Sequence, residues 1–164
     1  MSQRGVYFAL GLEDARKVAA TTSDAELRTI VQDEIEERGD EAWLFQVDKG
    51  WAGIHRCLTD GQLACDNGEY PLRACVLGGK QLHNEDDFVV SFLTSQQVAD
   101  VASALASVDR EWLRERYRAI DPATYGAPAT DEEFDYIWTC FSGLPAFFGR
   151  AVAAHRAVIF TVDL

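Results

Sequence analysis

Hydrophobic positions follow two rhythms along the chain, and together these predict strands near both ends with helices between them. Largely apolar runs at Val6–Leu10, Phe88–Leu93 and Ala157–Val162 are rich in β-branched and aromatic residues, which is typical of buried strands. A shorter apolar segment covers Trp43–Val47. This order indicates the α+β class. We expect a single compact domain over residues 1–164, with a small mixed sheet that uses the N- and C-terminal strands and helices packed around it.

The segments between the strands carry apolar residues at helical spacing, preceded by residues that cap helices. Ser23, Thr94 and Thr130 are each followed three positions later by Glu or Gln, the signature of a capping box. The expected helices cover Leu12–Ala20, Ser23–Gly39 and Asp48–Gly61, and others begin near Thr94, Asp109, Thr130 and Pro145. The helix from Asp109 is expected to bury Trp112, Leu113, Tyr117 and Ile120.

The stretch Asp48–Gly61 is the most informative of these helices. Its apolar stripe consists of Trp51, Ile54, Cys57 and Leu58. Asp48 is expected to cap its start, and Gly61 to end it in a left-handed turn. His55 follows Trp51 by four positions, so the two rings are neighbours on one flank and form a candidate pocket wall. The alternative is a core helix whose His55 makes a single hydrogen bond to the backbone.

Composition is ordinary for a globular protein, with 48% hydrophobic and 26% charged residues, but the net charge of -12 is not. Such a surface repels nucleic acid and anionic membranes, so we expect neither as a partner. A basic protein or a cationic ligand is favoured instead. No apolar run approaches the roughly 20 residues of a membrane helix, and we expect a cytoplasmic protein with reduced cysteines.

The motifs of several enzyme classes are missing from the chain. There is no G-x-S-x-G elbow, Walker loop, H-E-x-x-H pair or dinucleotide fingerprint, so serine, phosphoryl and nicotinamide chemistries are disfavoured and no cofactor is expected. The cysteines contain no C-x-x-C pair. The acidic loop His83–Asp87 lacks the alternating ligands of an EF-hand, so we expect a solvated loop and no metal site.

Several stretches resemble the YfbM-like family, a bacterial family of unknown function. They are Gly5–Leu10, Asp48–His55, Leu77-Gly78-Gly79, Phe92-Leu93-Thr94 with Val98 and Ala99, and the terminal Val158–Asp163. The resemblance spans nearly the whole chain and implies a compact α+β domain of this size, without implying an activity. Members often carry a His shortly after the Trp, where this chain has Ala52, which argues against a site with two histidines.

Two functional hypotheses follow. The first is a protein-binding module that covers a basic partner, as immunity proteins cover toxins. Its contact candidates lie on two acidic faces: Glu34, Glu37 and Glu41 on the first, Asp131 and Glu132 on the second. The alternative is a small-molecule-binding protein or enzyme with a pocket around Trp51 and His55. Its ligand-binding candidates are Tyr7, Asp48, Trp51, His55 and His83.

Overall fold

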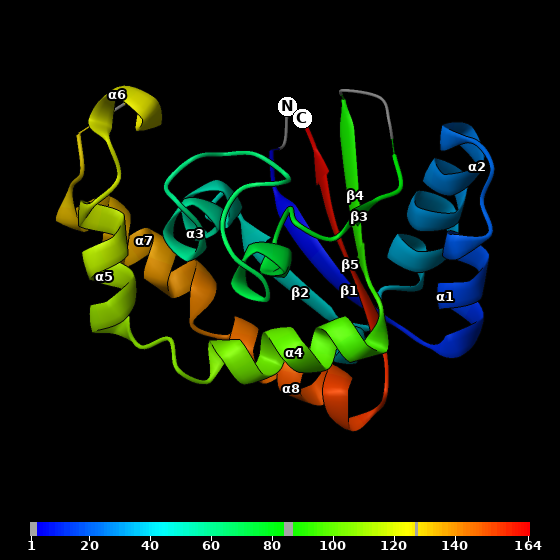
Figure 1. Cartoon of the computed structure of the whole chain (residues 1–164). Coiled ribbons are helices and arrows are strands. Elements are labelled where there is room, and N and C mark those ends of the chain that lie inside the picture. The colour runs from blue at the N-terminus through cyan, green and yellow to red at the C-terminus, as the bar shows by residue number, and fades with distance from the viewer. Residues whose placement is uncertain (1–2, 84–86, 127) are drawn as a thin grey trace.

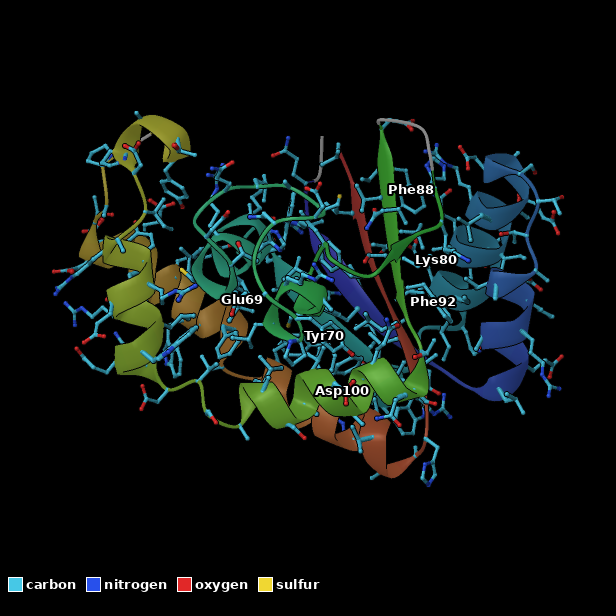
Figure 2. The ribbon with its side chains drawn as sticks, viewed as in Figure 1. Glu69, Tyr70, Lys80, Phe88, Phe92 and Asp100 are labelled. Atoms are coloured by element: carbon cyan, nitrogen blue, oxygen red, sulfur yellow. The ribbon has the colours of Figure 1, made fainter. Side chains whose placement is uncertain are left out.

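A five-stranded sheet forms the centre of the computed structural model, which describes residues 3–83, 87–126 and 128–164 (Figure 1). The strands are β1 (Gly5–Leu10), β2 (Leu44–Asp48), β3 (Lys80–Gln81), β4 (Phe88–Leu93) and β5 (Ala157–Asp163), in the order β2-β1-β5-β4-β3. The two ends of the chain pair at the centre, from Gly5 opposite Val162 to Leu10 opposite Ala157. At the edge, Lys80 of β3 lies opposite Phe92 of β4 (Figure 2).

The α+β class is confirmed, and the sheet uses both terminal strands as expected. The expected mixed pairing is corrected, because every pairing in the sheet is antiparallel. The cause lies in the connections. After β1 the chain turns back through helices and re-enters the sheet with Leu44 opposite Phe8, close to where β1 ended. β2 therefore runs back along β1, and β5 does the same on the other side.

Helices cover both faces of the sheet. The helices of the described residues are α1 (Leu12–Ala19), α2 (Asp24–Thr29), α3 (Trp51–Leu58), α4 (Ser95–Leu105), α5 (Arg110–Arg118), α6 (Pro122–Tyr125), α7 (Asp131–Phe141) and α8 (Leu144–Ala153). Short pieces are the π-helix η1 (Ile30–Glu36) and the 3-10 turns η2 (Glu41–Trp43) and η3 (Leu72–Cys75). In Figure 1, α1 and α2 lie on one side of the sheet, and α3, α4, α7 and α8 lie on the other, with α5 beyond them.

The alternation of side chains along β1 explains why there is a core cluster on each face of the sheet. Tyr7 and Ala9 belong to the larger core cluster, whereas Phe8 and Leu10 belong to the smaller one, because successive side chains of a strand point to opposite faces. In the larger cluster the Tyr7 ring lies 5.0 Å from that of Phe160. The smaller cluster packs Val31 and Ile35 of η1 and their neighbours against the opposite face.

The predicted caps are confirmed in part. Thr94 forms both halves of its capping box with Gln97. Ser23 and Thr130 also accept the expected backbone N–H bonds, but the acids of their boxes bond elsewhere. Glu26 binds Thr22. The Glu133 carboxylate instead accepts hydrogen bonds from the hydroxyls of Tyr117 and Tyr125. The expected helix over Ser23–Gly39 is divided into α2 and η1.

Asp48 does not cap α3, so that expectation is wrong. It ends β2 with a left-handed φ of 50°, and its carboxylate lies 3.2 Å from Arg4 Nε. Pairing of β2 with Gly5 holds Asp48 at the sheet, and α3 begins without a side-chain cap. Gly61 behaves as predicted: with φ at +93°, its N–H donates to Arg56 O over 3.1 Å and closes the helix.

Candidate functional site

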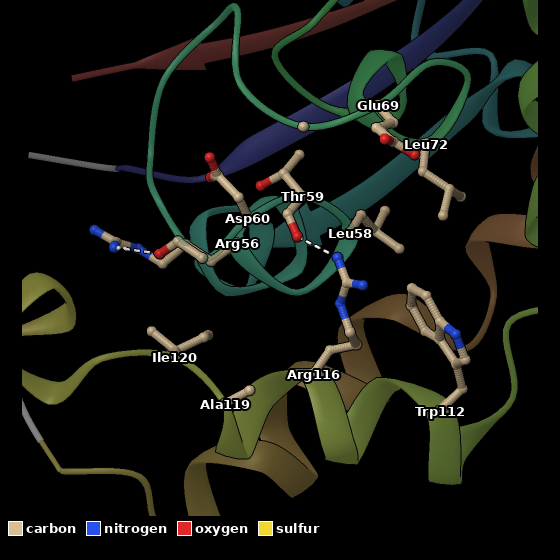
Figure 3. Close-up of a pocket in the computed structure, with 12 residues that line it drawn as sticks. Arg56, Leu58, Thr59, Asp60, Glu69, Leu72, Trp112, Arg116, Ala119 and Ile120 are labelled. Carbon is tan, nitrogen blue, oxygen red and sulfur yellow. Dashed lines mark hydrogen bonds between the residues drawn. The ribbon is translucent and has the colours of Figure 1, made fainter.

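A cavity of about 660 Å³ opens between the C-terminal end of α3, one face of α5 and residues 59–72, which we call the rim segment (Figure 3). That volume lies within the roughly 300–1,000 Å³ range of small-molecule sites. The lining is mixed. Leu58, Leu72 and Trp112 give it an apolar wall, whereas Arg116 and Glu69 bring opposite charges to it. The cavity therefore offers both surface and polar groups to a ligand.

Arg116 bridges the cavity from one wall to the other. It rises from α5, where its Nε donates to Cys57 O over 3.2 Å and its Nη2 donates to Thr59 O. Its guanidinium carbon lies 5.0 Å from the centre of the Trp112 ring, in cation–π geometry. Figure 3 shows Arg116 with Trp112 and Leu72 to one side and Ala119 and Ile120 to the other. The guanidinium of Arg116 thus connects α5 to the carbonyls at the C-terminal end of α3. A positive charge is favourable at that end of a helix, because its last carbonyls lack partners within the helix.

Asn67 holds the rim segment in shape. Its Nδ2 lies 3.1 Å from Thr59 Oγ1, 2.6 Å from Asp60 Oδ1 and 2.8 Å from Gln62 O. Its Oδ1 lies 2.9 Å from His55 Nε2. Hydrogen bonds from Asn67 and from the Gln62 backbone lower the pKa of Asp60. A single amide therefore connects the edge of the cavity to the buried helix behind it.

Gly68, which follows Asn67, allows the rim to pack closely. Its φ of +81° lies in the left-handed region, and a Cβ at this position would come within 2.6 Å of Thr59 Cβ. The far end of the rim is also tied down, because the Tyr70 hydroxyl donates to Asp100 Oδ2 of α4 over 2.6 Å (Figure 2). The rim segment is therefore fixed at both of its ends.

His55 supports this cavity from behind and does not line it. Its side chain is fully buried, and because the Asn67 amide nitrogen is engaged as a donor, His55 Nε2 carries the proton and donates to Asn67 Oδ1. Burial lowers the pKa of His55, against the opposing effect of the Asn67 hydrogen bond. A buried neutral imidazole with a fixed donor acts as a support for the rim.

The other rings proposed as ligand contacts are buried. Trp51 is 7% exposed, and its Nε1 donates to Gln3 O over 2.8 Å. Tyr7 is fully buried and donates to Cys75 O over 2.7 Å, and burial raises its pKa. His83 lies edge-on to Phe88 with ring centres 5.2 Å apart, next to residues 84–86, which lie outside the described part of the chain.

The five ligand-binding candidates are consequently not brought together, and none of them lines the cavity. The side chains of Tyr7 and Trp51 pack in the larger core cluster. Asp48 lies at the edge of the sheet beside Arg4, His55 lies behind the rim segment, and His83 lies near β4. The pocket wall expected at Trp51 and His55 is therefore not observed, because neither side chain lines the cavity. The helix that carries them does reach the cavity, but through Arg56 and Leu58, with Thr59 following at its C-cap.

The acidic candidates for a protein partner fall into two separate groups. Glu34 pairs with Lys17 over 3.5 Å, and Asp131 pairs with Arg114 over 3.1 Å. Glu37, Glu41 and Glu132 make no ion pair within the described ranges. The first group follows α2 and the second begins α7, and these helices lie at opposite ends of the molecule (Figure 1). The two acidic faces do not form one continuous surface.

The sequence did not single out Trp112, Arg116, Asp60, Glu69 or Leu72, which shape the cavity. Trp112 was expected in the core, yet it is half-buried at the cavity wall. One signal was available: Arg116 follows Trp112 by four positions, so both lie on the same face of α5. A second was the turn dipeptide Asn67-Gly68.

Thiol and metal chemistry receive no support from the described residues. All four cysteines are free thiols. Burial raises the pKa of both Cys57 and Cys75 to about 12, which leaves them protonated and poorly nucleophilic. Residues 3–83, 87–126 and 128–164 contain no group of three or more metal-ligating His, Cys, Asp or Glu side chains. In the same ranges, no helix is long and apolar enough to span a membrane.

Comparison with known proteins identifies the family. A model described as a domain of unknown function, DUF1877, matches residues 1–161. The chain belongs to the DUF1877 family. The crystal structure of YfbM from Escherichia coli, a protein of unknown function, is similar over 97% of this chain and 99% of that one, with a TM-score of 0.67 and 22% identity. No curated protein matches. The resemblance to YfbM-like proteins is confirmed, and at this identity the match establishes the fold alone.

Proposed function

We propose that this protein binds a small molecule in the cavity between α3, α5 and the rim segment. The observation that carries the proposal is a ligand-sized hollow in which the Arg116 guanidinium and an indole wall face a rim fixed by Asn67. Such pre-organised polar groups beside apolar surface are the usual composition of a ligand site. This keeps the small-molecule hypothesis and moves its site from Trp51 and His55 to the cavity at the C-terminal end of α3.

Binding is favoured over catalysis by the groups that reach the hollow. Its ionisable side chains are two arginines and two carboxylates, Arg56, Arg116, Asp60 and Glu69. General acid–base catalysis is most efficient when a group with a pKa near the working pH, most often a histidine, lies within reach of the substrate. His55, the nearest imidazole, is sealed behind Asn67, and the thiol of Cys57 is buried. These features support a site that holds a ligand without transforming it.

Filling the cavity tests the proposal. Ala119 lines the cavity at the end of α5, and Ala106 occupies the equivalent exposed position at the end of α4, away from it. Both have right-handed helical backbone, so neither position imposes backbone strain on Phe. We expect small molecules that raise the melting temperature of the wild type, in a panel of amino acids, peptides, nucleosides and sugars, to lose their effect on Ala119→Phe and to keep it on Ala106→Phe.

Two results would contradict the proposal. The first is a set of stabilising compounds that act equally on both variants, which would place their site elsewhere. The second is a panel without any compound that depends on the cavity. Nuclear magnetic resonance of the Trp112 indole reports directly on the cavity wall, and an unshifted indole resonance is expected in both of these cases.

A second candidate, the protein-binding module, keeps one specific support. Glu37 and Glu41 lie close together in sequence, and neither forms an ion pair in the described portion of the chain. Retention of a basic protein at low salt, lost in the double variant Glu37→Gln/Glu41→Gln and kept in Glu34→Gln, is the expected result for that function. Glu34 is the control because it already pairs with Lys17. Equal retention by the wild type and both variants would count against the protein-binding function.

A further inference from the structure

Arg116 brings an incompletely used cation to the cavity. Its Nε and Nη2 donate to carbonyls of α3, whereas its Nη1 has no protein partner among the described residues. No carboxylate in those residues forms an ion pair with it, although the chain carries 27 acidic residues. A guanidinium whose remaining donors face open space is suited to a carboxylate, which it binds through charge-assisted hydrogen bonds.

Glu69 brings the opposite charge to the same cavity. Its carboxylate forms no ion pair within the part of the chain that the structure covers, and its place on the rim is fixed by the Tyr70 hydrogen bond to Asp100. Asp60, the other acid of the lining, is already engaged by Asn67 and by the Gln62 backbone. Glu69 is therefore the carboxylate that remains for a cationic group.

Apolar surface lies between these two charges. Figure 3 places Leu72 and Glu69 on one side of the cavity and Trp112 on the facing side, with Arg116 beside Trp112. Leu58 completes this wall. A ligand that reached from Arg116 to Glu69 would lay its middle part against leucine side chains and the indole, which favour an apolar or aromatic body.

Charge balance selects among ligands. The cavity carries two arginines and two acids, and the whole protein carries a net charge of -12. A simple anion is repelled by the net charge of the protein and leaves Glu69 unpaired, and a simple cation leaves the remaining donors of Arg116 unpaired. A molecule with one charge of each sign meets neither penalty. We propose that the ligand is zwitterionic, an amino acid or short peptide whose carboxylate binds Arg116, whose ammonium group binds Glu69 and whose apolar side chain packs on Trp112 and Leu72. The inference rests on the proposed function and specifies its ligand.

The test uses L-leucine, L-phenylalanine and the dipeptide L-leucyl-L-phenylalanine as probes, titrated into the full chain while the Trp112 indole resonance is followed. Trp112→Phe assigns that resonance among the four tryptophans. We expect at least one probe to shift it, and N-acetylation or C-amidation of that probe to weaken binding by about twofold to fivefold each, since either change removes one partly exposed ionic contact.

Matched variants assign each charge to its partner. Glu69→Gln is expected to weaken the zwitterion but not the N-acetylated form, while Glu115→Gln, which removes the same charge from an exposed position of α5 outside the cavity, weakens neither. Arg116→Lys keeps the charge but loses the fork, so it is expected to weaken the probes that bear a carboxylate and to leave the amide unchanged. Glu69 is exposed, so its variant remains informative if Arg116→Lys is poorly folded.

Four outcomes would overturn the inference. Equal affinity of the free, acetylated and amidated probes would show that the charges are not recognised. Equal effects of Glu69→Gln and Glu115→Gln would remove Glu69 from the site. If none of the three probes shifts Trp112 while another compound binds in a manner abolished by Ala119→Phe, the ligand class is wrong but the cavity function stands. Absence of any compound that depends on the cavity removes both proposals.

Discussion

Two aromatic regions lie on either side of α3, and they differ in what fills them. On one face of the sheet, the ring centre of Tyr7 lies 6.1, 5.8 and 5.0 Å from those of Phe147, Phe148 and Phe160. Its hydroxyl donates a hydrogen bond to Cys75 O. Beside α5, Trp112 faces a hollow of about 660 Å³. Close packing leaves the first region no room for a ligand, whereas the second keeps both space and unused donors.

The difference shows that ring type does not identify a binding site. Tyr7 and Trp51 were the more conspicuous candidates in the sequence, yet both are core residues. Trp112 looked like one more apolar position of an ordinary helix. What distinguishes it is that no aromatic ring among the described residues packs over it, and that a cation, Arg116, lies across it instead.

The largest expected effect comes from removing an aromatic ring from the packed region. Phe148→Ala should lower the free energy of unfolding by about 3–5 kcal/mol, because it leaves an enclosed cavity. Leu72→Ala, at the existing hollow, should cost about 1 kcal/mol or less, since its removal only enlarges an open space. Urea denaturation of both variants measures the contrast. Similar losses would mean that the two regions are packed alike.

The next effect concerns the support of the hollow. Asn67→Ala removes the acceptor of His55 Nε2 and leaves that buried donor unpaired, which should cost about 1–3 kcal/mol. Faster amide hydrogen exchange across residues 59–68 is expected with it, because the rim loses the amide that connects its turns. Gln62→Ala, whose exposed side chain makes no such bonds, is the control. A rim that exchanges no faster in Asn67→Ala would contradict the role given to Asn67.

A smaller effect is expected where a single hydroxyl is removed from the packed region. Tyr7→Phe leaves Cys75 O without its donor and should cost about 1–2 kcal/mol. The matched variant Tyr70→Phe removes an exposed hydroxyl from Asp100 and should cost about 0.5 kcal/mol or less. Thermal unfolding ranks the pair. If Tyr70→Phe proved the more damaging, the rim and not the core would depend more on its tyrosine.

The smallest effect is a change with pH. Burial lowers the pKa of His55 in the folded protein below its ordinary value of 6.5, so on acidification the unfolded chain takes up a proton before the folded one does. His55 therefore makes stability fall as pH drops through 6.5 toward the folded pKa, below which the loss levels off. His55→Gln should reduce this loss, measured by urea denaturation above and below pH 6.5. The exposed His155→Asn should retain it. A wild-type loss unchanged by His55→Gln would place its origin elsewhere.

Local patterns in the chain determined much of the scaffold. Thr94 with Gln97 fixed the start of α4, Gly61 ended α3, and the apolar runs at both termini marked β1 and β5. Each of these signals acts over a few neighbouring residues, so it can be read without knowledge of the rest of the molecule. The net charge of -12 likewise follows from composition alone.

Only the tertiary structure decided which side chains meet at the cavity. Asn67 bonds to His55 across 12 positions of the sequence, and Arg116 bonds to Cys57 O across 59. A periodic pattern of hydrophobic residues does not predict contacts over such separations. The direction of strand pairing was decided in the same way, by where the connections return the chain to the sheet. A hollow is a place where packing partners are missing, and no single residue in a sequence can record that absence, because it depends on how all the surrounding elements come together.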